Sequence, residues 1–104
     1  LYNFSGKTNL LELIELIRLS RLVIANDSAS VHIACAVKTN SICISGGNNF
    51  GRFVPYPKGF NYSPKTVYNN ECLEKKWRCQ KFHRCIKQVK KEDVFQKVEN
   101  ILDN

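Results

Sequence analysis

The chain has 104 residues, the size of one small domain and too short for a complete two-domain enzyme. Hydrophobic residues make up 43% and charged residues 24%, a balance typical of a folded globular protein rather than a disordered or fibrous one. The net charge of +7 favours anionic partners, and no apolar segment approaches the roughly 20 residues that a membrane-spanning helix needs.

The start of the chain shows no targeting signal, because residues 1–7 lack the charged-then-apolar layout of a signal peptide. Without such a signal or a spanning segment, we expect a soluble, cytoplasmic protein. The sequence contains no methionine, so we also expect it to be the C-terminal part of a longer protein. The five cysteines are odd in number, and Cys35 and Cys43 lie within apolar segments. A disulfide framework is therefore not indicated.

The first elements alternate between helix and strand. Asn9 and Glu12 have the spacing of a helix capping box, and the apolar residues that follow recur with helical period. This pattern predicts a helix from about Leu10 to Ser20. The short apolar run at 22–25 predicts a strand that is buried on both faces.

A second helix and a second strand follow. The helix is expected over 29–37, capped by Asp27 or Ser28 and largely buried. The strand is expected over 41–45 and runs into two glycines. The order helix, strand, helix, strand predicts parallel strands with right-handed crossovers, hence an open α/β sheet.

The remainder of the chain divides into a long loop and a final helix. Residues 48–70 contain all three prolines and three of the four tyrosines, with no helical or alternating pattern. They begin a loop and cysteine-rich basic segment, 48–91, between an α/β core, 1–47, and a C-terminal helix at 92–104. The apolar residues of that helix share one face: Val94, Phe95, Val98, Ile101 and Leu102.

The turn between the first strand and the second helix carries the strongest chemical signal. In an open parallel sheet, ligands bind beyond the carboxyl ends of the strands, where this turn must lie. The helix starting near Ala29 presents free backbone N–H groups that suit a phosphate or diphosphate. Ser28 and Ser30 add hydroxyl donors, and His32 is placed to bind a phosphate or ribose oxygen. The alternative is structural: Asp27 and Ser28 only cap a helix, and His32 is a half-buried side chain.

Several segments match one known family in order and spacing. They are Asn3-Phe4-Ser5-Gly6-Lys7-Thr8, the leucine-rich helix, the strand at 22–24, the motif Asn26-Asp27-Ser28-Ala29-Ser30-Val31-His32-Ile33-Ala34, Gly46-Gly47, the Gly51-Arg52-Phe53 and Pro55-Tyr56-Pro57 loop, the cluster of Cys72, Trp77, Cys79 and Cys85, and the final helix. In these features the sequence resembles the C-terminal domain of glycosyltransferase family 9, the lipopolysaccharide heptosyltransferases. The family motif usually has Gly where Ala29 stands, and Ala does not share the freedom of Gly to adopt positive φ.

This resemblance implies a two-domain GT-B enzyme. Its Rossmann-like C-terminal domain binds an ADP-sugar donor, and its N-terminal domain binds a lipid-linked saccharide acceptor of the lipopolysaccharide core. The family transfers heptose with inversion and needs no metal or other cofactor. By the same resemblance, one set of neighbouring residues holds the donor diphosphate: Asp27, Ser28, Ala29, Ser30 and His32.

Further contacts are expected from the resemblance and from charge. Phe4 and Ser5 would lie near the nucleoside. Arg52 either points into the cleft between the domains and binds an anion or fixes a surface loop. The general base and a basic donor-site residue of the family are expected before Leu1, so this chain alone is expected to be inactive.

One group of residues has the composition of a zinc site: Cys72, Cys79, His83 and Cys85. The separations of six, three and one residues do not match common zinc spacings. We expect no bound metal here but a reduced cluster packed under Trp77.

Between Lys75 and Lys91 the sequence carries eight Lys or Arg and no acid. This basic run suits a solvated face. It also suits peripheral contact with anionic lipid at the inner face of the inner membrane. Nucleic acid is not expected, because no recognised nucleic-acid-binding fold accompanies the charge.

Two hypotheses for function follow. The first is the donor-binding part of an inverting glycosyltransferase that moves heptose, or a related sugar, from an ADP-sugar to a lipopolysaccharide core acceptor. The second is a non-enzymatic basic module that binds polyanions and is stabilised by zinc.

Overall fold

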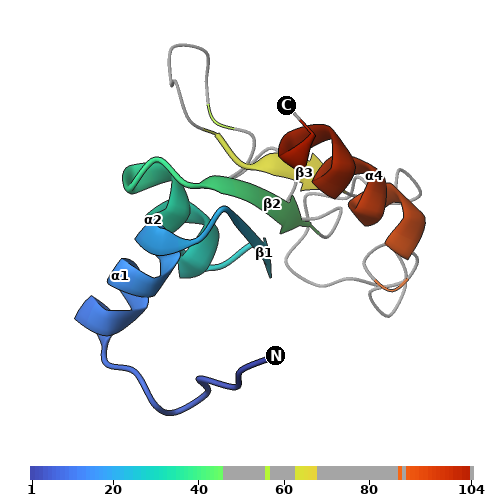
Figure 1. The fold of residues 1–104 in the computed structure, drawn as a ribbon. Helices are drawn as coiled ribbons and strands as arrows, with labels where there is room; N and C mark the ends of the chain where they lie inside the picture. The colour runs from blue at the N-terminus through green and yellow to red at the C-terminus, as the bar shows by residue number, and fades with distance from the viewer. Residues whose placement is uncertain (46–55, 57–62, 68–86, 88, 104) are drawn as a thin grey trace, which may run out of the picture.

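The computed structural model describes residues 1–45, 56, 63–67, 87 and 89–103. The elements over these residues are α1 (Leu10–Leu19), β1 (Leu22–Asn26), α2 (Ala29–Ala36), β2 (Asn40–Ile44), β3 (Lys65–Val67) and α4 (Lys91–Leu102). The strands form one parallel sheet in the order β1-β2-β3. Helices α1 and α2 lie on one side of the sheet and α4 on the other (Figure 1). The predicted α/β fold with an open parallel sheet is confirmed.

The start of α1 follows from its sequence. The Asn9 side chain accepts a hydrogen bond of 2.8 Å from the backbone N–H of Glu12, and the Glu12 carboxylate accepts one of 3.1 Å from the N–H of Asn9. This is the predicted capping box, which satisfies two N–H groups that the helix cannot pair itself. Farther along α1, Arg18 and Glu15 form an exposed ion pair that raises the pKa of Arg18 and lowers the pKa of Glu15 through their hydrogen bonds.

Helix α2 ends with a lysine, Lys38, at the position that glycine usually occupies. The backbone N–H of Thr39 bonds to the carbonyl of Ala34 at 2.8 Å, and the N–H of Lys38 bonds to that of Cys35 at 3.2 Å. This pair of bonds is the Schellman pattern, which needs a left-handed residue just past the helix. Lys38 takes that conformation with φ of 63°. The helix therefore ends where the sequence predicted a break.

The core lies between α2 and the sheet. Val31 and Ala34 of α2 and Ile42 and Cys43 of β2 are fully buried. The central strand β2 is covered on both sides, because α2 contacts one face and α4 the other. The prediction that α2 is largely buried holds only for its sheet-facing side, since Ala29 at its start is exposed.

The prediction that the first strand is buried on both faces is wrong. Ile24, in the middle of β1, is 49% exposed. The reason is that α4 packs on β2 and β3, while β1 lies at one edge of the described sheet. Ile24 instead lines an open apolar groove of about 490 Å³ with residues of β2 and α4: Ile44, Val94, Phe95 and Val98.

The C-terminal part differs from the prediction in one element. β3 lies inside the segment predicted as loop, and it pairs with Ile42 to Ile44 of β2. Helix α4 begins one residue before the predicted start and places Val94 half-buried against the sheet side, with Phe95 62% exposed. Within the described part of the chain, none of the helices has the length and apolar character to cross a bilayer.

Candidate functional site

The candidate site lies at the carboxyl edge of the sheet. β1 ends at Asn26, two residues connect it to α2, and the neighbouring β2 ends at Ile44 beside it. The amino end of α2 therefore lies at the edge where open α/β sheets bind their ligands. The order of elements puts the predicted residues 27–32 at this edge.

The first turn of α2 is not capped by a side chain. Ser28 occupies the N-cap position with extended backbone, φ of −145° and ψ of 176°, but makes no side-chain bond to the helix. Its hydroxyl instead donates to the carbonyl of Asn26 at 3.2 Å. The predicted cap residue is thus in place, but the predicted capping bond is not formed. Among the described residues, neither the N-cap hydroxyl nor an acid of the first turn bonds to these N–H groups, and the partial positive charge of the helix end favours an anion.

Ala29 and Ser30 leave this helix end open. Ala29 is exposed, and Ser30 is half-buried. The small side chain of Ala29 adds only one carbon at the position where a ligand would approach the amides. Small side chains thus stand beside the first backbone N–H groups of α2, the kind of helix end that suits an anion.

Asp27 and His32 lie together across this turn. The Asp27 Oδ1 atom is 3.5 Å from the His32 Nε2 atom, with 6% of the Asp27 side chain and 37% of the His32 side chain exposed. The second Asp27 oxygen, Oδ2, is buried and has no hydrogen-bond partner among the described residues. The buried carboxylate thus faces the imidazole, while the imidazole itself reaches the surface.

A residue without a predicted role, Tyr56, completes this cluster. Its hydroxyl lies 2.6 Å from His32 Nδ1, and the two rings are stacked with centroids 5.7 Å apart and 12° between their planes. Sequence spacing gives no signal for this contact, because 24 residues separate the two side chains. The Pro55-Tyr56-Pro57 segment predicts a loop, but the sequence does not predict which side chain Tyr56 contacts.

Two predicted contacts do not join this cluster. Phe4 is 47% exposed and stacks at a tilt near Tyr2, with ring centroids 6.3 Å apart. The Ser5 N–H donates to the Asn3 side chain at 2.9 Å, within a turn stabilised by the Lys7 N–H to Phe4 carbonyl bond. No described hydrogen bond connects Phe4 or Ser5 to α2, so their placement near a nucleoside stays a prediction.

Other predicted residues lie outside the described part of the chain. These are Arg52 and the candidate zinc ligands Cys72, Cys79, His83 and Cys85. Among the residues that are described, no three His, Cys, Asp or Glu side chains form a group that could hold a metal ion. Cys35 and Cys43 are both free thiols.

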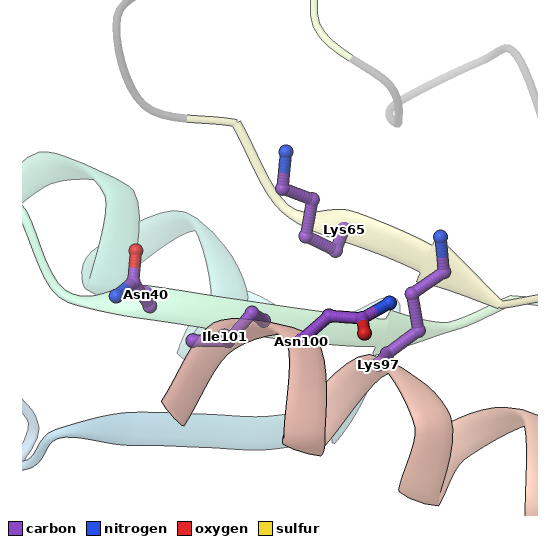
Figure 2. Close-up of a pocket in the computed structure, with 5 residues that line it drawn as sticks. All are labelled: Asn40, Lys65, Lys97, Asn100 and Ile101. Carbon is purple, nitrogen blue, oxygen red and sulfur yellow. The ribbon is translucent and has the colours of Figure 1, made fainter. Parts of the chain in front are cut away.

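A second hollow lies at the opposite end of the strands. Figure 2 shows its lining: Asn40 and Lys65 from the starts of β2 and β3, and Lys97, Asn100 and Ile101 from α4. Its volume is about 480 Å³. Two lysines make this hollow attractive to anions, but it lies at the amino edge of the sheet, away from Asp27 and His32.

Comparison with known proteins identifies the family. The model of glycosyltransferase family 9 (heptosyltransferase) matches residues 1–83, which include the whole β1–α2 turn. The chain belongs to glycosyltransferase family 9. The resemblance carried by the motif at 26–34 is therefore confirmed, as is the family predicted from it.

Two curated proteins are similar to the chain over nearly its full length. One is lipooligosaccharide heptosyltransferase 2 of Campylobacter jejuni subsp. jejuni serotype O:2, 29% identical over 106 residues that cover 98% of this chain. The other is lipooligosaccharide heptosyltransferase 2 of serotype O:6, 28% identical over 103 residues that cover 95% of this chain. The matches cover 32% and 31% of these relatives, so the chain spans about one third of their length. No solved structure gives a significant match.

Proposed function

We propose that this chain binds the nucleotide-sugar donor of an inverting glycosyltransferase, which moves heptose or a related sugar from an ADP-sugar to a lipopolysaccharide core acceptor. Membership of glycosyltransferase family 9 and the two lipooligosaccharide heptosyltransferase relatives support the class of reaction. The observation that carries the proposal is the amino end of α2, which lies at the carboxyl edge of the parallel sheet without a side-chain cap.

The chemistry of sugar transfer explains why such a helix end is useful. As the glycosidic bond to the nucleotide breaks, the leaving diphosphate gains negative charge. Backbone N–H groups fixed at a helix terminus stabilise that charge without having to reorganise during the reaction. In this proposal the N–H groups around Ala29 and the hydroxyl of Ser30 contact the diphosphate. No cofactor takes part.

Asp27 and His32 have different roles in this proposal. A carboxylate repels phosphate oxygens. The Asp27 side chain is only 6% exposed, and its carboxylate faces His32. Asp27 therefore orients the imidazole instead of touching the diphosphate. His32, which reaches the surface, supplies an N–H donor to the donor substrate.

The remaining parts of the reaction need groups that this chain does not supply. An inverting transfer requires a base that deprotonates the acceptor hydroxyl. We assign no residue of this chain to that step and propose that the chain by itself is inactive. The net charge of +7 is compatible with peripheral contact at the cytoplasmic, inner face of the inner membrane, where a lipid-linked acceptor would be reached.

A charge placed at the helix end tests the site. Ala29→Glu puts a carboxylate in the first turn of α2, where it favours the helix by about 0.3–1 kcal/mol but repels a diphosphate. We expect ADP affinity of the intact protein, measured by calorimetry, to fall at least about tenfold without loss of thermal stability. The matched control is Ala36→Glu, which adds the same charge at the exposed other end of the same helix. It should change ADP affinity by less than about twofold, since α2 is roughly 10 Å long.

The second hollow provides a further control. Lys65→Gln combined with Lys97→Gln removes two charges at the amino edge of the sheet and should leave ADP affinity unchanged. If this double variant weakens ADP binding and Ala29→Glu does not, the α2 site is wrong. That outcome favours a basic module that binds polyanions generally, whose affinity falls steeply with salt.

A further inference from the structure

Tyr56 is held firmly beside His32 from outside the α2 helix. Its ring packs against the buried pair Val31 and Cys43, which forms the apolar centre under the site. Its backbone N–H donates to the Ser63 hydroxyl at 3.2 Å. The phenol is therefore fixed at both its ring and its backbone, and its hydroxyl is directed at His32 Nδ1 at 2.6 Å.

The phenol of Tyr56 is able to donate this hydrogen bond. Burial, together with the nearby Cys35, Asp27 and Cys43, raises the pKa of Tyr56 to about 12. The phenol thus keeps its proton at neutral pH, and a neutral imidazole can accept that proton's hydrogen bond only at the nitrogen that lacks hydrogen. An accepting Nδ1 leaves the ring hydrogen on Nε2.

The other side of the ring decides which nitrogen carries the hydrogen. Nε2 lies 3.5 Å from Asp27 Oδ1, so the nearby carboxylate favours a hydrogen on Nε2. With the hydrogen on Nδ1 instead, the Nε2 lone pair would face a buried carboxylate, which repels it. The distance of 3.5 Å is longer than a normal N–H···O bond, so the Nε2–H group is not fully engaged by Asp27.

We propose that Tyr56 is a positioning residue for His32, whose hydroxyl donates to Nδ1 and holds the imidazole in the Nε2–H form that the donor site uses. The consequence for binding rests on the proposed function. A phosphate or sugar oxygen can accept from Nε2–H, whereas an Nε2 lone pair would repel it. Tyr56 thus contributes to donor binding without touching the donor.

Imidazole nitrogen spectra of the intact protein test this role directly. ¹⁵N NMR with labelled histidine distinguishes the two neutral tautomers, and a His32→Gln variant identifies the signals of His32. We expect the unsubstituted protein to show the Nε2–H form at neutral pH without any donor present. Tyr56→Phe keeps the stacked ring and removes only the hydroxyl, so the Nδ1–H form should become populated.

The same variant links the tautomer to binding. ADP affinity of Tyr56→Phe should fall about threefold to tenfold, the loss expected when one hydrogen-bonding group is no longer fixed. Tyr2→Phe is the matched control, because Tyr2 is 89% exposed and lies against Phe4. It should leave the His32 signals unchanged, and Ala36→Glu remains the control for ADP affinity.

The possible failures are distinguishable. An Nδ1–H form in the unsubstituted protein, or a tautomer that Tyr56→Phe leaves unchanged, overturns the positioning role. The role is also overturned if Tyr56→Phe changes the tautomer but leaves ADP affinity undiminished, while Ala29→Glu does weaken ADP binding. If Ala29→Glu has no effect on ADP binding, the proposed donor site fails, and the NMR result still decides whether Tyr56 sets the His32 tautomer.

Discussion

The hydroxyl of Thr39 donates a hydrogen bond of 3.0 Å to the backbone carbonyl of Ile17, 22 residues earlier in the chain. Both residues are only 5% exposed, so water does not compete for this bond. Ile17 lies in the last turn of α1, and Thr39 immediately precedes β2. The bond therefore fixes α1, which packs on α2, to the amino edge of the sheet.

Removing this hydroxyl should destabilise the protein modestly. In Thr39→Val the shape is retained and the bond is lost, and we expect the free energy of unfolding to fall by about 0.5–1.5 kcal/mol. The cost stays in this range because the Ile17 carbonyl still accepts from the Ser20 N–H at 3.1 Å. Urea unfolding measures the change. Thr39→Ser keeps the hydroxyl, and a serine variant less stable than the valine variant would show that the methyl group, not the bond, matters.

Glycine at position 38 should stabilise the end of α2. Lys38 has φ of 63°, in the left-handed region that costs an L-residue about 1 kcal/mol or more. Lys38→Gly removes this cost, while the unfolded chain gains some conformational freedom, so we expect a net gain of up to about 1 kcal/mol. Thermal unfolding measures it. Lys38→Ala removes the same side chain but keeps the strain, and an equal gain in that variant would mean that the lysine charge had been the unfavourable feature.

The buried thiol of Cys43 should make stability fall in alkaline solution. Burial, with a smaller contribution from Asp27, raises the pKa of Cys43 from 9.0 to about 11. Below about pH 9 the thiol is neutral in both the folded and the unfolded chain. Between pH 9 and about 11 the unfolded chain loses this proton while the folded chain keeps it, so rising pH favours unfolding. One such group contributes a slope of at most about 1.4 kcal/mol per pH unit.

Urea unfolding at several pH values tests this prediction. Cys43→Ala should be less stable overall, because it leaves a cavity beside Val31, but its stability should fall less steeply between pH 9 and 10. Tyr56, with a pKa of about 12, adds a similar effect only above pH 10, its ordinary value. Equal slopes for the two proteins between pH 9 and 10 would contradict a neutral, buried Cys43.

Local sequence patterns predicted the elements of this fold other than β3 and the turn that carries its candidate site. The Asn9 and Glu12 capping box fixed where α1 starts, because both of its hydrogen bonds lie within one turn. The alternation of helix and strand through Ile44 required parallel strands, which put the turn after Asn26 at the ligand-binding edge. The motif at 26–34 carried the family resemblance that the comparison confirmed.

Only the tertiary structure decided what surrounds these elements. The exposure of Ile24 depends on which helix covers which strand, and the apolar run at 22–25 contains no information about its neighbours. β3 has three residues, too few for a periodic pattern. It is a strand because its backbone pairs in parallel with β2. The Ser28 hydroxyl bonds to the Asn26 carbonyl and not to the helix, which its N-cap position alone does not reveal. Tyr56 and His32 are 24 residues apart in the chain, and contacts between such distant residues are set by packing that no local spacing encodes.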